Sequence, residues 1–234
     1  MNPLKPTTYY KILGPRGTPL LGYRNDKWQL PRGHPGKWTD LRYPHICVMG
    51  WHLIPNIGIS RQLRVGILYT AEGRGQYDAQ PDKVSFESAR LLKRVGEITL
   101  DDIEYFAQLW LERTKAYCTT DELRSQRYVD INAGSKSPDY RAARSYFEQC
   151  QHNYRAARNY FEQCQHKIEQ CKSALPYPDN TIITDYRSLH VKNACAYTSY
   201  IASCAANVAQ YSGSSTYTEY LLQSYAVLEH IGRR

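Results

Sequence analysis

Over the first 98 residues, apolar and polar positions alternate in short runs separated by glycine and proline, a pattern typical of β-strands joined by turns. Residues 8–13 form the clearest run. The sequence Gly14-Pro15-Arg16-Gly17 follows with the proline and glycine positions of a type I turn, so residues 20–23 are expected to return as a strand. Further strands are expected at 27–30, 46–49, 67–72 and 83–92, and a faint helical pattern lies near 57–63.

At residue 99 the apolar spacing changes to every third or fourth residue, which predicts helices for the rest of the chain. Thr99 and Asp102 resemble a capping box, in which a hydroxyl and an acid three residues later bind the first free amides of a helix. We expect a helix from this box through Tyr117. A weaker second helix is expected over 120–131, followed by a polar connector at 132–137.

The clearest helical signal is an internal duplication. Residues 140–152 (YRAARSYFEQCQH) recur as 154–166 (YRAARNYFEQCQH), 14 residues or two heptads later. Alternate steps of four and three residues meet only apolar side chains or thiols, at Ala143, Phe147, Cys150, Tyr154, Ala157, Phe161, Cys164, Ile168, Cys171 and Leu175. This 3.5-residue period predicts a coiled-coil-like seam. Capping by Ser137 and Pro138 and a stop at Pro176 predict one helix over about 138–174.

Two shorter apolar stripes predict further helices, at about 194–211 and 216–231. The second begins with a Thr216–Glu219 capping box and has Gly232 in C-cap position. Short connectors favour an antiparallel bundle within the chain, and the alternative is self-association through the helix at 138–174. The expected fold class is therefore α+β, with a strand-rich domain over 1–98 and a helical domain over 99–234.

The net charge of +8 lies entirely in the first of these two parts. Residues 1–98 hold 15 Lys and Arg against 7 Asp and Glu, whereas residues 99–234 hold 15 of each kind. A positive field confined to one domain attracts a polyanion or an acidic partner. The alternative is that the charge only keeps a small β-rich domain soluble.

The chain shows no targeting or membrane signal. It has no run of about 20 apolar residues, and its first residues lack the apolar core of a signal peptide. Its seven cysteines are odd in number and contain no C-x-x-C pair, which is typical of free thiols in a reducing compartment. We therefore expect a cytoplasmic protein without a membrane partner.

Neither group of cysteines and histidines predicts a metal site. The spacings of Cys150, Cys164 and Cys171 along one helix place them about 10 Å or more apart, so a core role is favoured. The set His34, His45, Cys47 and His52 offers four potential zinc ligands within 19 residues, but it lacks the paired spacing of known zinc sites. We expect no metal and no cofactor.

Two kinds of functional residue remain. His52, and Glu72 at a strand end beside glycine, are candidate catalytic residues, although no nucleotide-binding or hydrolase motif accompanies them. Basic residues interleaved with an aromatic are candidates for binding nucleic acid, because Lys and Arg neutralise phosphates while Trp stacks on bases. These binding candidates are Arg24, Arg32, His34, Lys37, Trp38, Arg42 and Arg74. The alternative for the tryptophans is that Trp28, Trp38 and Trp51 form the core of the β domain.

Several segments within residues 8–95 resemble a known family. They include Tyr10-Lys11-Ile12-Leu13-Gly14, Cys47-x-x-Gly50-Trp51-His52-Leu53 and the strand entering Glu72-Gly73-Arg74-Gly75. Together they are similar to an uncharacterised domain of phage and bacterial proteins, in which a Cys-x-x-Gly-aromatic-His element precedes a strand carrying Glu. The resemblance implies a phage origin and action in the host cytoplasm, and it brings no established chemistry.

We therefore expect a non-enzymatic phage accessory protein whose basic domain binds nucleic acid or an acidic protein. One alternative is a transferase that uses a nucleotide such as NAD, with His52 and Glu72 as catalytic residues. The other is a purely structural protein that oligomerises through its long helix.

Overall fold

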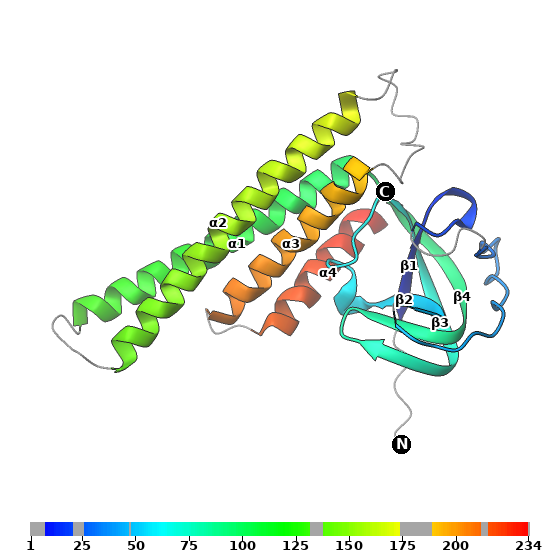
Figure 1. The fold of residues 1–234 in the computed structure, drawn as a ribbon, viewed down its shortest axis with the longest axis horizontal. Helices are drawn as coiled ribbons and strands as arrows, with labels where there is room; N and C mark the ends of the chain where they lie inside the picture. Colours follow the sequence, from blue (N-terminus) through cyan, green and yellow to red (C-terminus); the bar gives the residue numbers. More distant parts are fainter. Residues whose placement is uncertain are drawn as a thin grey trace.

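The fold is known from a computed structural model, which describes residues 8–20, 26–46, 48–131, 138–173, 189–211 and 215–233. Within these residues, four antiparallel strands close into a barrel in the order β1-β2-β4-β3, and four helices follow them (Figure 1). The strands are β1 (Tyr9–Leu13), β2 (Trp51–Pro55), β3 (Gly66–Gln80) and β4 (Lys83–Ile98). The helices are α1 (Leu100–Ile131), α2 (Pro138–Ser173), α3 (Leu189–Tyr211) and α4 (Thr216–Gly232). The predicted α+β class is confirmed.

Two long strands make most of the barrel wall. β3 and β4 pair from Gly66 opposite Ile98 to Gln80 opposite Lys83, and three shifts in register interrupt the pairing. Such irregularities bend a strand, which lets a strand of this length curve around a small barrel. Trp28 and Trp51 pack edge to face inside, with 5.1 Å between ring centroids, so the core role considered for the tryptophans holds for these two.

Two predicted strands are wrong. Residues 26–46 are irregular, and backbone hydrogen bonds from Gly36 to Leu91, Thr39 to Ala89 and Arg42 to Glu87 lay part of them along β4. The apolar residues near 27–30 pack in the barrel core from within this irregular segment. Their burial therefore does not require a β-strand. Of the predicted strand at 46–49, Ile46, Val48 and Met49 are described; His45 and Met49 are bridged by backbone hydrogen bonds, and Cys47 lies outside the described residues. The true strand, β2, begins two residues later at Trp51.

The first turn also differs from expectation. Arg16 and Gly17 have φ angles of 60° and 76°, so the turn is centred one residue later than predicted and both central residues are left-handed. Glycine adopts that conformation without strain, which fits its place here. The predicted return strand shrinks to one bridge between Leu13 and Pro19. Residues 21–23 of that strand lie outside the described part of the chain.

The helices follow the predicted stripes closely. α1 is one helix where two were expected, and its capping box is confirmed: the Thr99 amide and hydroxyl donate to one Asp102 oxygen at 2.8 and 2.7 Å. The second capping box is wrong, because the Glu219 carboxylate is buried and binds Arg113 of α1. Gly232 is the last helical residue of α4. The expected connector at 132–137 and the stripe positions Ala143, Phe147 and Leu175 have no described side chains.

The duplicated seam is filled by neighbours within the chain. Consecutive helices run antiparallel, and α2 lies against both α1 and α3 (Figure 1). Cys150 packs with Cys118 and Val208, whereas Cys164 lies against Ala194 and Thr198 of α3. The thiols of the stripe are therefore core residues, as expected.

The barrel and the bundle share one hydrophobic core. Residues of β1 and β3 such as Tyr10 and Leu68 cluster with Trp110 of α1 and Ile231 of α4. β4 has Gly96 where a side-chain carbon would meet Ile231 at 2.6 Å, so the strand and the end of α4 are in close contact. None of the described helices combines the length and apolar character needed to cross a membrane.

Candidate functional site

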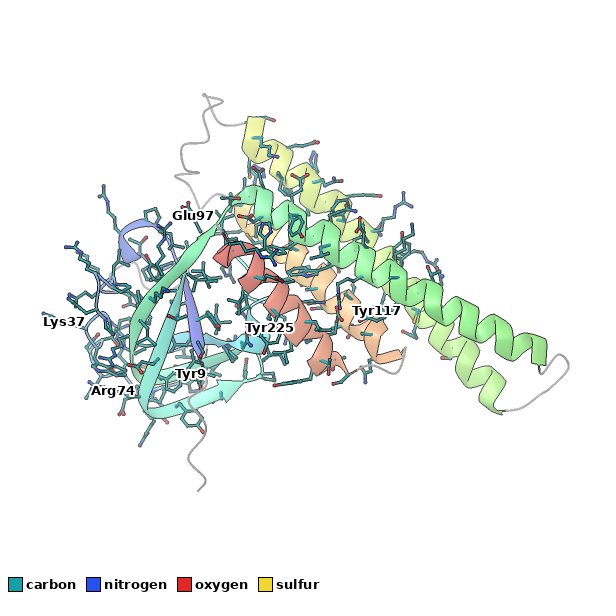
Figure 2. The ribbon with its side chains drawn as sticks, turned by 180° about the vertical axis from the view of Figure 1, so that it is seen from behind. Tyr9, Lys37, Arg74, Glu97, Tyr117 and Tyr225 are labelled. Atoms are coloured by element: carbon teal, nitrogen blue, oxygen red, sulfur yellow. The ribbon has the colours of Figure 1, made fainter. Side chains whose placement is uncertain are left out.

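The structure gathers several predicted binding residues at the end of the barrel that lies away from the helices. Arg74 of β3 and Arg90 of β4 both place their guanidinium groups over the ring of Trp38, at 4.3 and 4.6 Å from its centroid. Lys37 is the neighbour of Trp38 and is exposed. In Figure 2, Lys37 and Arg74 lie at the edge of the barrel farthest from the bundle. We call Lys37, Trp38, Arg74 and Arg90 the basic patch.

An adjoining loop extends this patch. The Lys37 amide donates to the Gln29 side-chain oxygen at 3.1 Å, and a side-chain carbon on Gly36 would meet the Gln29 carbonyl oxygen at 2.3 Å. The two ends of the loop at 29–37 are therefore in contact, and only a glycine fits at that crossing. Arg32 and His34 project from the loop and are exposed.

Most cations of the patch lack a carboxylate partner. Among the described residues, no ion pair involves Arg32, Lys37 or Arg74, whereas Arg90 binds Glu72 across the strand pair. Cation–π contacts with Trp38 hold Arg74 in place without neutralising its charge. The patch therefore presents ordered positive charge to solvent.

Arg42, another predicted binding residue, makes its contacts within the protein. It binds Asp26 at 2.7 Å and lies over the Trp51 ring at 4.2 Å, so its charge is already used inside the protein. The Trp51 indole in turn donates to the Asp40 carbonyl at 2.8 Å. Arg24, also a predicted binding residue, lies outside the described residues.

The two candidate catalytic residues are not brought together. Glu72 of β3 is engaged by Arg90. His52 lies on β2, whose registered partners are in β1 and β4, and it lines a cleft whose lining does not include Glu72. Burial lowers the pKa of His52, and the charges of Lys11 and Lys83 lower it further. These effects favour the neutral form of His52.

That cleft was not foreseen from the sequence. Its volume is about 1070 Å³, and it opens where β1 and β2 separate. The two strands register only at Tyr9–Pro55 and Tyr10–Ile54. Beyond these pairs the Lys11 ammonium crosses toward β2 and donates to the His52 carbonyl at 2.8 Å. A side chain thus occupies a place where a further strand pair would otherwise form.

Basic groups dominate the polar lining of the cleft. Within the described part of the chain, Lys11, Arg42, Arg64 and Lys83 line it, against one carboxylate from Asp26. Burial, only partly offset by Asp26, lowers the pKa of Lys11 to about 8, and the positive charge of Arg64 acts in the same direction. Burial also lowers the pKa of Arg64. The cleft is therefore a region where positive charge is insufficiently compensated.

One sequence signal pointed to this cleft and was missed. Tyr9, Lys11 and Leu13 share one face of β1, and both neighbours of Lys11 on that face pack in the barrel core. A lysine at an inward position of an alternating strand is unusual, because burying an unpaired ammonium is costly. Arg64 gave no comparable signal.

The described residues hold no group of three His, Cys, Asp or Glu side chains placed to bind a metal ion. Cys47, one of the four ligands considered, is outside those residues. His34 and His45 are exposed, and His52 is half-buried in the cleft.

In comparisons with known proteins, no family model, no curated protein and no solved structure matches this chain. The resemblance to a phage and bacterial domain of unknown function therefore stays a prediction. The candidate site rests on the geometry of the barrel alone.

Proposed function

We propose that the barrel is a non-enzymatic binding module for nucleic acid and that the basic patch with its adjoining loop is the contact surface. The observation that carries the proposal is the stacking of Arg74 and Arg90 over Trp38 beside the unpaired Lys37. Side chains separated in sequence converge there on one aromatic ring. Arg74 and Lys37 have no ion pair among the described residues, so their positive charge is left for a partner outside the molecule, whereas Arg90 is paired with Glu72.

The chemistry of the patch favours nucleic acid over an acidic protein. A guanidinium held over an indole offers a planar surface on which a base stacks, in addition to hydrogen bonds to phosphate. An acidic peptide also accepts hydrogen bonds from the guanidinium groups, but it has no base to stack on them. Trp38 is half-buried, so its ring is anchored while part of it stays accessible.

Titration of a fluorescently labelled single-stranded oligonucleotide, followed by anisotropy at several salt concentrations, tests the proposal. The full-length triple variant Arg32→Gln/Lys37→Gln/Arg74→Gln removes three unpaired charges from the surface. We expect at least about tenfold weaker binding at low salt. The slope of log affinity against log salt should fall by about 2, since each single-strand phosphate contact contributes about 0.7.

The matched control is Lys115→Gln/Arg155→Gln/Lys167→Gln, which removes three charges from α1 and α2, outside the barrel that carries the patch. It should change the affinity by less than about threefold, because long-range effects of exposed charges are screened. Equal losses in the two variants would show that only net charge matters. Binding to a poly-glutamate peptide but not to the oligonucleotide would point to an acidic protein partner.

Neither alternative function gains support from this geometry. Glu72 is bound to Arg90, whereas His52 lines the cleft. The two proposed catalytic groups of the transferase hypothesis are therefore not assembled into one site. The seam of α2, where described, packs against α1 and α3 of the same chain. Self-association through that seam stays a prediction.

A further inference from the structure

The cleft between β1 and β2 carries a second inference, separate from the basic patch. Arg64 lines the cleft and is half-buried, yet no carboxylate among the described residues lies within ion-pair distance of it. Removing a cation from water without a counter-charge is costly, so such groups are normally paired. An unpaired arginine in a cleft is therefore a site that an anion would complete.

Lys11 supplies a second positive group to the same space. Its ammonium donates to the His52 carbonyl at 2.8 Å and lies 5.1 Å from the centre of the Trp28 ring. Among the described residues that line the cleft, the one carboxylate, that of Asp26, is bound to Arg42 at 2.7 Å. Lys11 and Arg64 thus share a region in which the available negative charge is already engaged.

The remaining lining is largely apolar. Leu20 and Ile54 contribute partly exposed aliphatic surface, and Val48 and Met49 form an exposed apolar rim. At about 1070 Å³ the cleft exceeds the needs of a bare phosphate ion and is at the upper end of small-molecule sites. It suits a ligand with an anionic head and a planar or apolar body.

We propose that this cleft binds a terminal phosphate monoester attached to a nucleoside-sized body, with the phosphate between Lys11 and Arg64. A monoester carries close to two negative charges at neutral pH, and two cations match it better than they match one carboxylate. The body lies against the aliphatic lining. This site is independent of the basic patch and of the function proposed for it.

Proton uptake distinguishes this site from a nonspecific positive surface. A dianion beside Lys11 stabilises its protonated form, so binding near pH 8 draws protons onto the protein. Affinity should then fall by up to about tenfold per pH unit as the pH rises above 8. Calorimetry in buffers of different ionisation enthalpy measures the proton uptake directly on the wild-type chain.

Isothermal titration with adenosine 5′-monophosphate, adenosine and inorganic phosphate tests the proposal. We expect the nucleotide to bind, phosphate to bind more weakly and adenosine to bind least. Arg64→Gln should weaken nucleotide binding about tenfold to a hundredfold, the range for loss of a charge-assisted hydrogen bond. The control Arg61→Gln removes a nearby exposed arginine that does not line the cleft, and it should leave the affinity within about twofold.

Lys11→Arg offers a further check, since an arginine keeps its proton at high pH. The variant should retain affinity at pH 9.5, where the wild type has lost it. Equal effects of Arg64→Gln and Arg61→Gln would overturn the proposal. So would nucleotide binding without proton uptake by the wild-type chain near pH 8, a result that does not depend on any variant folding.

Two sources of the same chemistry remain to be told apart: a free nucleotide and the phosphorylated end of an oligonucleotide. Oligonucleotides with and without a 5′-phosphate provide this test. A preference for the phosphorylated form that Arg64→Gln abolishes identifies a strand end, and equal affinities with intact nucleotide binding identify a free nucleotide. Arg32→Gln/Lys37→Gln/Arg74→Gln should leave nucleotide binding unchanged, so failure at one site does not imply failure at the other.

Discussion

The barrel part and the helical part of the chain contain equal numbers of lysines and arginines but use them differently. In the helices, half of the cations with described side chains form ion pairs: Arg113 binds Glu219, and Lys172 binds Asp101 and Glu104. In the barrel, Arg64 and Arg74 have no ion pair among the described residues. The difference indicates that charge holds the bundle together, whereas the barrel keeps part of its charge available for ligands.

The Arg113–Glu219 pair is the strongest example on the bundle side. The guanidinium donates to both carboxylate oxygens at 2.7 and 2.6 Å, and the Tyr117 hydroxyl donates at 2.7 Å. Gln223 adds a fourth donor. Hydrogen bonding to Glu219 raises the pKa of Arg113 above its usual value. The network fastens α4 to α1 and so positions the helix that packs against the barrel.

The largest effect is expected when this network loses its carboxylate. Glu219→Gln leaves Arg113 partly buried without a counter-charge, and the unfolding free energy should fall by about 3 to 5 kcal/mol. Urea unfolding at pH 7 measures the change. A double variant, Arg113→Met/Glu219→Gln, should recover part of the loss. A loss below about 1 kcal/mol in the single variant would contradict the role assigned to the pair.

The second effect tests Lys11 through its pH dependence. The folded pKa of about 8 lies below the usual 10.5, so between these pH values the unfolded chain holds a proton that the folded chain lacks. Wild-type stability therefore gains from this group as pH rises through that window, and a Lys11→Met variant lacks the gain. The stability of the variant relative to wild type should decline by about 1 to 3 kcal/mol between pH 8 and 10.5. Urea unfolding under reducing conditions checks this, and a constant difference would contradict it.

A third, smaller effect has the opposite sign to the first. Arg64→Met removes a half-buried cation that has no carboxylate partner, so stability should stay the same or rise by up to about 1 kcal/mol. Thermal and urea unfolding of this variant beside Arg61→Met provide the measurement. A loss of more than about 1 kcal/mol would mean that Arg64 supports the fold, and the contrast between the two halves would then weaken.

The smallest effect concerns an exposed pair. Arg158 and Glu162 of α2 bind at 3.1 Å one helical turn apart, and both side chains are more than half exposed. Glu162→Gln should change the unfolding free energy by no more than about 0.5 kcal/mol, because solvent screens such pairs. Urea unfolding alongside Glu219→Gln gives the comparison. Similar losses in both variants would show that burial does not decide the strength of ion pairs here.

The helices could be predicted well from the sequence because each depends on a local period. The stripe through Cys150, Cys164 and Ile168 defines the buried face of α2, and prolines near both ends define its length. The capping role predicted for Glu219 was wrong because a glutamate at this position fits a capping box and a buried ion pair equally well. Only the position of Arg113, over a hundred residues earlier, distinguishes them.

The barrel and its sites were less predictable because they depend on contacts between distant segments. The basic patch joins Trp38 to Arg74 and Arg90, and only the register of β3 with β4 places the two arginines together. The cleft depends on where β1 and β2 separate, and the inward position of Lys11 is the one local signal that pointed to it. Charge asymmetry pointed to the barrel half of the molecule, but it did not separate paired cations such as Arg42 from Arg64, which has no ion pair among the described residues.

The junction between β4 and α1 has a mechanical consequence. Thr99 is the single residue between the two elements, and its amide and hydroxyl are both fastened to Asp102 in the first turn of the helix. Such a short and hydrogen-bonded link leaves α1 and β4 little freedom to move relative to each other. A force applied at the far end of the helix would therefore be transmitted to β4 as a torque, and the strand would bend before the link extended.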